Sequence, residues 1–153
     1  MIKKTLIFVA CLAPWFLTSI IPADYSYYDS LILPFFALPK VAFPIIWTIL
    51  YILIAISMYG VFSTCSFKET PKSYKRSLII NYLFNQSFTI FFFLLKNNFL
   101  GFISCLGTFI SSLFLYHETF KINEKSTTYL DLYVLFNLFA SILSLTIYIM
   151  NNM

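Results

Sequence analysis

Charged residues are scarce in this chain. Asp, Glu, Lys and Arg make up only 10% of its 153 residues, against about a quarter in ordinary soluble domains. Hydrophobic residues make up 60% of the chain and aromatic residues 21%. So few polar side chains cannot cover the surface of a protein that folds in water. The composition therefore excludes a soluble domain and predicts a single all-α domain, residues 1–153, that is a polytopic membrane protein.

Histidine and cysteine are also rare, with one His and three Cys. Cys11, Cys65 and Cys105 are far apart and odd in number, so they fit neither a zinc site nor a disulfide framework, and we expect small buried thiols. His117 is expected in a solvated loop. The sequence contains no nucleophile–base pair, carboxylate pair, glycine-rich phosphate loop or metal-ligand cluster. These absences argue against hydrolysis or group transfer and predict that no metal or cofactor is required.

The apolar residues form long runs, and a membrane-spanning helix needs about 20 of them. Five stretches qualify and predict a five-transmembrane-helix bundle: 5–21, 43–64, 77–95, 99–116 and 129–150. The first stretch imitates a signal peptide but has no Ala-x-Ala cleavage site, so we interpret it as an uncleaved span. A basic connector at 68–76, a tight turn at 96–98 and a polar loop at 117–128 are expected between the later spans.

Basic residues are distributed unevenly between the two predicted sides. Of the ten Lys and Arg, only Lys40 and Lys96 fall on the side of the first loop. The positive-inside rule then places the N-terminus in the cytoplasm and the C-terminus outside, in a bacterial cell membrane. A net charge of +4 at helix ends points to the lipid bilayer and not to nucleic acid. No ionisable residue lies well inside a span, which argues against ion-coupled transporters and haem ligation.

Three prolines precede the second span. Pro34, Pro39 and Pro44 fix their own φ and bias the preceding residues toward extended backbone, so the segment before the helix cannot be helical throughout. We expect a stiff lid that runs into a helix carrying Trp47 and Tyr51.

Polar and aromatic side chains share one face of the third span, at Asn81, Asn85, Phe88 and Phe92, with Gln86 and Ser87 beside them. Asparagine is costly in contact with lipid, so this face should point into the bundle, either for interhelical hydrogen bonds or as a ligand cradle. The fifth span offers a facing stripe of Tyr133, Phe136, Ala140 and Ser144. Together with Trp47, Tyr51 and the loop aromatics, these faces predict a mainly aromatic cavity for a large, flat, apolar ligand. The loop aromatics are Tyr27, Tyr28, Phe35 and Phe36.

The fourth span carries small residues instead: Gly101, Ser104, Cys105, Thr108, Ser111 and Ser112. Small residues at this spacing let helices approach closely. The sequence leaves open whether they pack within the bundle or form a dimer.

These residues carry a resemblance to the TspO/MBR family, the tryptophan-rich sensory and translocator proteins. Tyr27-Tyr28 and the prolines correspond to its first loop, and Pro44 to Tyr51, reading PIIWTILY, corresponds to the start of its second helix. The third-helix motif matches Asn85-x-x-Phe88-x-x-x-Phe92-Phe93, and the fifth-helix motif matches Tyr133-x-x-Phe136-x-x-Phe139-Ala140. Asn85-Gln86 and Ser144 are especially similar to members from Bacillus.

The resemblance implies a five-helix bundle, usually a homodimer, that binds tetrapyrroles such as porphyrins and drug-like apolar molecules. It assigns the pocket to Tyr28, Trp47, Asn85, Phe88, Phe136 and Ala140. Some bacterial members degrade protoporphyrin in light through pocket tryptophans, and here Phe136 replaces the one on the fifth helix. Phenylalanine keeps the stacking surface but loses the easily oxidised indole, so Trp47 alone remains for such chemistry.

Three functions therefore remain open from the sequence. The first is a membrane receptor or sensor that binds tetrapyrroles. The second is a light- or oxygen-dependent enzyme that degrades porphyrin. The third is a helical membrane partner or assembly protein without a ligand.

Overall fold

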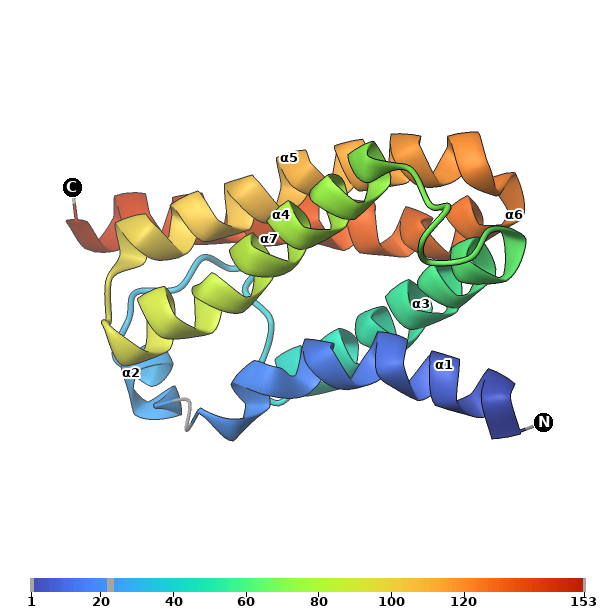
Figure 1. The fold of residues 1–153 in the computed structure, drawn as a ribbon. Coiled ribbons are helices and arrows are strands. Elements are labelled where there is room, and N and C mark those ends of the chain that lie inside the picture. The colour runs from blue at the N-terminus through green and yellow to red at the C-terminus, as the bar shows by residue number, and fades with distance from the viewer. Residues whose placement is uncertain (1, 22–23, 153) are drawn as a thin grey trace.

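The computed structural model describes residues 2–21 and 24–152, and every regular element among them is helical (Figure 1). The elements follow one another along the chain as α1 Ile2–Leu12, η1 Ala13–Ile20, α2 Tyr25–Asp29, α3 Ala42–Thr64, α4 Lys72–Phe88, η2 Thr89–Leu94, α5 Asn98–Ile122, α6 Glu124–Thr127, η3 Thr128–Leu130 and α7 Asp131–Asn152. The all-α expectation is confirmed. The side chain of Lys3, one of the basic residues assigned to the cytoplasmic side, lies outside what the structure describes.

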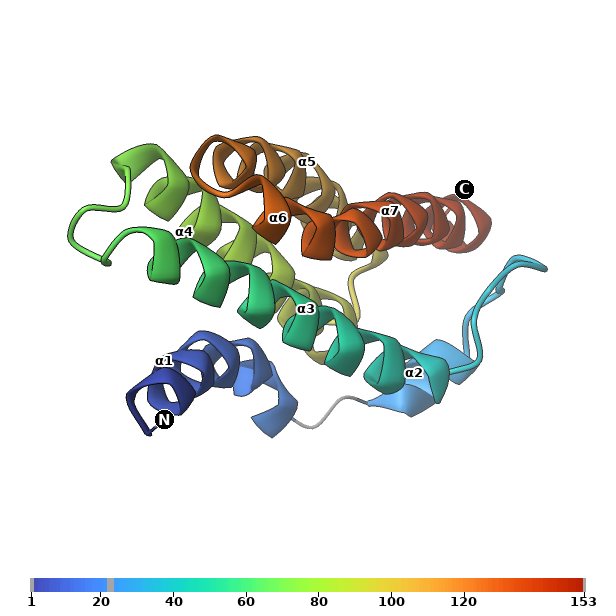
Figure 2. The ribbon, with the colours of Figure 1, turned by 90° about the vertical axis from the view of Figure 1, so that its right-hand side faces the viewer.

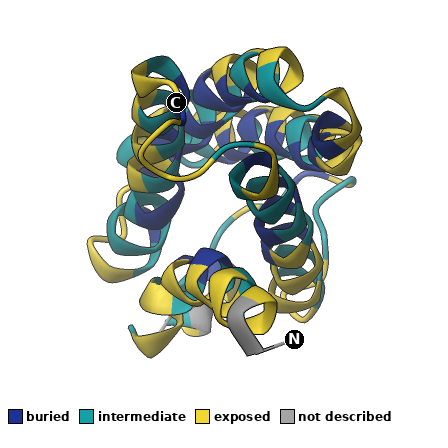
Figure 3. Cartoon of the chain, turned by 45° about the vertical axis from the view of Figure 1, so that its right-hand side comes forward, coloured by how far each residue is buried: buried dark blue, intermediate teal, exposed yellow. Residues whose placement is uncertain are grey.

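Four helical segments are long and apolar enough to cross a membrane: Ala42–Thr64, Lys72–Leu94, Asn98–Ile122 and Glu124–Asn152. The first apolar stretch is a shorter helix, Lys4–Ile20. Exposed apolar side chains cover the outside of these helices, as Leu83, Leu135 and Phe114 do at 60%, 63% and 61% exposure (Figure 3). An apolar exterior of this kind is what an integral membrane protein requires, because its helices face lipid.

Two predicted connectors are partly helical. The basic segment before the third span enters α4 at Lys72, directly after Pro71, whose extended backbone (φ −54°, ψ 142°) begins the helix. The prediction of a polar loop at 117–128 is wrong, because α5 continues to Ile122 and α6 begins at Glu124. His117 is therefore exposed on a helix and not in a loop. The helix α5 can continue past its apolar run because a helix satisfies its own backbone hydrogen bonds, whether it lies in the membrane or in water.

The small-residue stripe of α5 faces the inside of the bundle. Gly101, Ser104, Cys105, Thr108, Ser111 and Ser112 are all buried, and α5 lies between α4 and α7 (Figure 2). A Cβ atom at Gly107 would lie 2.3 Å from Phe84 Cδ1, so this α4–α5 approach requires glycine. Of the two roles that the sequence left open for the stripe, the structure uses it for packing within the chain.

One end of the bundle is held together by polar contacts between segments far apart in sequence. Asn151 at the end of α7 donates to Ile32 O (2.9 Å) and accepts from Ile32 N (2.8 Å), which fastens the proline-rich loop. Lys96, in the left-handed conformation with φ 51° at the expected α4–α5 turn, pairs with Asp24 at 2.8 Å. The C-terminus lies at this end and the N-terminus at the other (Figure 1).

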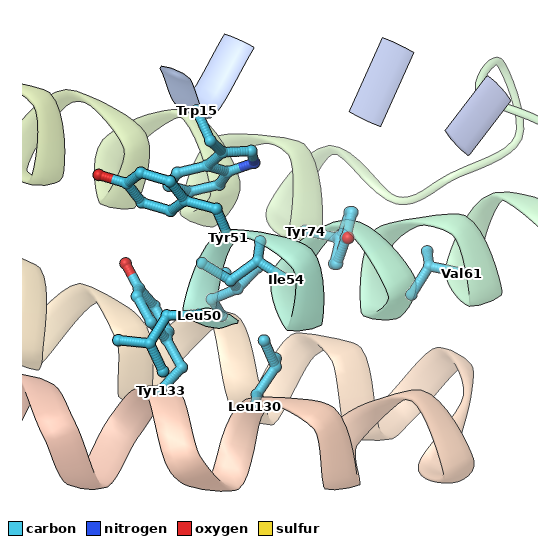
Figure 4. Packing of buried hydrophobic residues seen from close by; sticks show 9 residues of the cluster. Trp15, Leu50, Tyr51, Ile54, Val61, Tyr74, Leu130 and Tyr133 are labelled. Atoms are coloured by element: carbon cyan, nitrogen blue, oxygen red, sulfur yellow. The ribbon is translucent and has the colours of Figure 1, made fainter. Parts of the chain in front are cut away.

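A buried cluster connects η1, α3 and α7. Trp15 of η1 is 1% exposed and lies against Tyr51 of α3, while Tyr133 of α7 packs on the opposite side of α3 (Figure 4). The sequence argument did not single out Trp15. Trp15 belongs to the core at the point where the chain passes from α1 into η1.

Candidate ligand-binding site

A cavity of about 380 Å³ lies between η1, α2, the first turns of α3, the α4–η2 junction, α5 and α7. Ligand pockets in proteins are about 300–1,000 Å³, so its size is within that range. Its wall is mostly aromatic and aliphatic, with a few hydroxyls and one amide. The lining residues are Phe16, Thr18, Ser19, Ile21, Tyr28, Phe43, Pro44, Trp47, Thr48, Tyr51, Asn85, Phe88, Thr89, Phe92, Phe93, Cys105, Phe136, Ala140, Leu143, Ser144 and Ile147.

The structure brings the sequence-predicted site residues together around this one cavity. They come from four separate helices and are Tyr28, Trp47, Asn85, Phe88, Phe136 and Ala140. Tyr51, one turn after Trp47, also lines it. The face of α7 that carries Phe136, Ala140 and Ser144 therefore lies opposite the face of α4 that carries Asn85 and Phe88.

Three loop aromatics that the sequence placed in the cavity lie elsewhere. Phe35 is fully exposed, and Phe36 packs against Phe139 with ring centroids 6.3 Å apart. Tyr27 contacts the edge of Phe92 and donates to Asn98 Oδ1 at 2.7 Å. The aromatic residues of the proline-rich loop thus lie farther from the cavity than predicted. Tyr28, whose hydroxyl donates to Leu38 O at 3.0 Å, is the residue that connects the loop to the cavity.

The sequence patterns did not predict that η1 forms part of the cavity wall. Phe16, Thr18, Ser19 and Ile21 line the cavity because the chain changes from an α-helix to a 3₁₀-helix at Ala13, one residue before Pro14. Runs of 3₁₀-helix longer than three or four residues are uncommon, and this one has eight. Pro14 was the available signal, since proline disrupts the α-helical hydrogen bonds around it.

Side chains of α4 hold η1 in place. Gln86 donates to Trp15 O (3.2 Å) and accepts from Thr18 N (3.2 Å), and Tyr82 donates to Pro14 O (3.0 Å). These bonds satisfy backbone groups that an irregular helix leaves free. The amide of Gln86, buried at 7% exposure, therefore fixes one wall of the cavity.

Asn85 is the polar centre of the cavity wall. Its Oδ1 accepts from the Tyr51 hydroxyl (3.0 Å) and from Gln86 Nε2 (3.2 Å). Its Nδ2 is 3.5 Å from the Tyr133 hydroxyl, which is a long hydrogen bond. Asn85 thus joins the cavity to the hydrogen bonds that hold η1, and a ligand donor that bonds to its Oδ1 competes with Tyr51 and Gln86.

Aromatic rings on a π-helical turn form another part of the wall. Residues Thr89–Leu94 adopt the π-helix η2, a form found mostly as single turns at functional sites. Phe88 and Phe92 stack nearly parallel, with centroids 5.1 Å apart and planes at 14°. Both rings line the cavity, so this pair adds aromatic surface that a conjugated ring system can contact.

Of the two tryptophans in the chain, Trp47 lines the cavity and Trp15 does not. Trp47 contacts Tyr51 (5.5 Å between centroids) and the edge of Phe136 (5.6 Å, planes at 89°). Trp15 is one ring farther away, behind Tyr51 at 5.7 Å. Phe136 occupies a place beside Trp47 where it adds contact surface but no indole.

The cavity wall carries no charged side chain among the residues that the structure describes. At this end of the molecule, charged residues lie in α2 and directly before it, and in the α4–α5 turn. There Lys96, together with Ser26, lowers the pKa of Asp24 to about 2. Burial raises the pKa of Tyr28 above its ordinary value, with a smaller contribution from the Asp29 carboxylate, so this hydroxyl stays protonated. The wall can stack, exclude water and donate or accept a few hydrogen bonds.

Comparison with known proteins identifies relatives over most of the chain. Residues 5–150 match the model of the TspO/MBR family. The chain is 36% identical over 130 residues to the "Tryptophan-rich protein TspO" of Bacillus cereus, which covers 85% of this chain and 84% of that protein. It is 37% identical over 130 residues to the "Uncharacterized membrane protein YtaB" of Bacillus subtilis, covering 85% and 83%.

Proposed function

The chain belongs to the TspO/MBR family of membrane proteins, and on that premise we propose that it is an integral membrane receptor for tetrapyrroles of the protoporphyrin type. The observation that carries this proposal is the single cavity onto which Tyr28, Trp47, Asn85, Phe88, Phe136 and Ala140 converge. Its volume, its stacked aromatic wall and its few polar groups suit a flat, conjugated and mainly apolar molecule.

The ligand is expected to lie with its polar edge outward. An ionised carboxylate is costly to bury without a partner, and the described lining residues offer no cation. The propionate groups of a porphyrin would then point toward α2 and the α4–α5 turn, where Lys96 and Lys40 lie at the surface. A drug-like apolar molecule of similar shape would fit the same wall.

We further propose that α1 and η1 together form a fifth span. Eleven α-helical residues rise about 16 Å and eight 3₁₀ residues about another 16 Å. The sum matches a hydrocarbon thickness of about 30 Å, although the apolar helix is short in residues. Five spans, with basic residues concentrated at the N-terminal end, would place the N-terminus in the cytoplasm and the C-terminus outside a bacterial cell membrane.

A homodimer, which the family resemblance predicts, would have to use an outer helix face. The small residues of α5 are already buried against the chain's own helices. A role as a partner protein without a ligand would depend on the same outer faces, and it predicts that no tetrapyrrole binds saturably.

The first test is porphyrin affinity in purified protein, followed by the absorbance shift or the fluorescence anisotropy of protoporphyrin. Trp47→Leu removes a stacking ring from the wall and should weaken binding about tenfold. Phe114→Leu, at a ring that is 61% exposed on the outside of α5, is the matched control and should leave affinity unchanged. Equal porphyrin affinities in wild type and Trp47→Leu would show that the porphyrin does not bind in this cavity.

Porphyrin breakdown is the second candidate function, and one contact favours it. Trp47 lies on the wall in ring contact with Tyr51, so two oxidisable side chains adjoin the ligand. Illumination of the protein with protoporphyrin tests it through decay of the Soret band. Decay no faster than in detergent alone would leave binding as the function.

A further inference from the structure

Two polar groups on the cavity side of α7 have no hydrogen-bond partner among the described residues: Asn137 Nδ2 and Ser144 Oγ. Their residues are 1% and 5% exposed. They lie two turns apart on one helix face with Ala140 between them, about 10 Å along the axis. In membrane helices such groups usually bond to a neighbouring helix, so both are conspicuous.

Asn137 lines a small chamber of about 10 Å³, roughly the space that one water oxygen needs. Trp47, Asn85, Phe88 and Ala140 line both this chamber and the main cavity, so the chamber adjoins the cavity. Thr108 of α5 forms part of its far wall.

Within the chain, the Tyr133 hydroxyl lies close to the Asn137 amide, but their contact does not reach good hydrogen-bond geometry. That hydroxyl already donates to Asn81 Oδ1 at 2.8 Å and accepts a long bond from Asn85 Nδ2 at 3.5 Å. Ser144 lies beside the Cys105 thiol, which is a weak hydrogen-bond partner. A buried donor without an acceptor lowers the stability of the fold. That cost is removed when a water molecule or a ligand supplies the acceptor.

The acceptor that fits is small and uncharged. The chamber has room for one oxygen atom. The described lining residues of both cavities include no cation to neutralise a carboxylate. A carbonyl oxygen at the edge of a flat ligand meets both conditions, and a second acceptor about 10 Å away would reach Ser144.

We propose that the chamber is a subsite for a carbonyl oxygen of the ligand, with Asn137 donating to it and thereby determining specificity. This inference rests on the proposed tetrapyrrole-binding function and narrows its ligand class. Closed porphyrin rings carry no carbonyl on their apolar edge, whereas open-chain tetrapyrroles end in lactam carbonyls. The cavity therefore prefers lactam-ended tetrapyrroles, and a water molecule occupies the chamber when a closed porphyrin is bound.

Biliverdin and protoporphyrin test this preference, because both carry two propionates and only biliverdin has lactam carbonyls. Asn137→Leu keeps the side-chain size and removes the donor. It should weaken biliverdin binding about tenfold or more and change protoporphyrin affinity less than twofold. The melting temperature of the ligand-free variant should be no lower than that of wild type, because the unpartnered donor is gone.

The outcomes separate the two proposals. If protoporphyrin binds wild type, and Asn137→Leu leaves biliverdin affinity unchanged or weakens both ligands equally, the subsite is wrong while tetrapyrrole binding stands. If neither ligand binds wild type saturably, the proposed function fails and the subsite with it. Should Asn137→Leu not fold, the infrared lactam stretch of biliverdin bound to wild type decides. A frequency below that in apolar solvent supports the hydrogen bond, and an unshifted frequency overturns it.

Discussion

Two asparagines one turn apart on α4 have different surroundings. Asn81 is fully buried, donates to Thr108 O and Ser111 Oγ, each at 3.0 Å, and accepts from the Tyr133 hydroxyl at 2.8 Å. Asn85 lines the cavity and shares its oxygen between Tyr51 and Gln86. The first joins α4, α5 and α7, and the second is within reach of a ligand. The residue type is the same, and its neighbours decide its role.

Replacement of Asn81 should therefore act on stability. Asn81→Leu leaves the Tyr133 hydroxyl without its acceptor, and we expect a loss of about 1–3 kcal/mol in the free energy of unfolding. Denaturant titration in detergent measures this loss. Asn85→Leu is the matched comparison and should lower porphyrin affinity more than it lowers stability. A variant pair with the opposite pattern would contradict the division between the two asparagines.

At the scale of elements, η1 is the part of the cavity wall that its own backbone stabilises least. A 3₁₀-helix of eight residues has poor hydrogen-bond geometry, so its position depends on the bonds from Gln86 and Tyr82. The long helices α3, α5 and α7 are different, because they are α-helical over more than 20 residues each. Ligand contact with Asn85 and the position of η1 are thus joined through one side chain, Gln86.

Removal of that connection should loosen η1 and leave the bundle intact. In Gln86→Leu, amide hydrogen exchange should accelerate at least about tenfold across residues 13–20 and stay unchanged across the middle of α3. Ser87→Ala on the same helix is the control, since Ser87 bonds to Phe84 O and Ser104 and not to η1. Uniform acceleration along the whole chain would mean that Gln86 supports the bundle and not this element.

For the whole molecule, the polar contacts at one end and the basic residues at the other define its two sides. The end that carries the proline-rich loop is fastened by Asn151 and by the Asp24–Lys96 pair. At the opposite end, Asn123 donates to Gly60 O and Thr64 Oγ1, which fixes the end of α3 against the α5–α6 corner. Polar groups thus hold the bundle at both ends, and its middle combines apolar packing with the buried hydrogen bonds of Asn81 and Asn85.

Cysteine labelling tests the number of spans and their orientation. In a chain with Cys65→Ser, Phe35→Cys should react with a membrane-impermeant maleimide added to intact cells. Lys4→Cys and Lys68→Cys, both at exposed positions, should react only after the membrane is permeabilised. Labelling of Lys4→Cys from outside together with Phe35→Cys would show that α1 and η1 do not cross, and reversal of all three would invert the orientation.

Much of the helix arrangement and much of the cavity followed from the sequence. A residue such as Asn85 cannot face lipid without cost, so its spacing with Phe88 and Phe92 predicts the inward face of α4. The helix faces and the motif resemblance both point to Trp47, Phe136 and Ala140, and these residues line the cavity. Composition alone predicts a membrane protein, because 10% charged residues are too few to keep a protein of this length soluble in water.

Only the tertiary structure decided which aromatic residues enclose the cavity and which polar groups lack partners. Phe35 and Phe36 are aromatic residues of the same segment as Tyr28, but they lie outside the cavity. The loop that carries them is fastened to Asn151 at the end of α7, and Phe36 packs against Phe139. The η1 segment forms part of the cavity wall, with Trp15 packed behind Tyr51, because Gln86, 71 residues from Trp15, bonds to the backbone of this segment. Periodicity along one helix specifies which way a face points, whereas hydrogen bonds between distant segments depend on how the helices pack, and no local pattern encodes that.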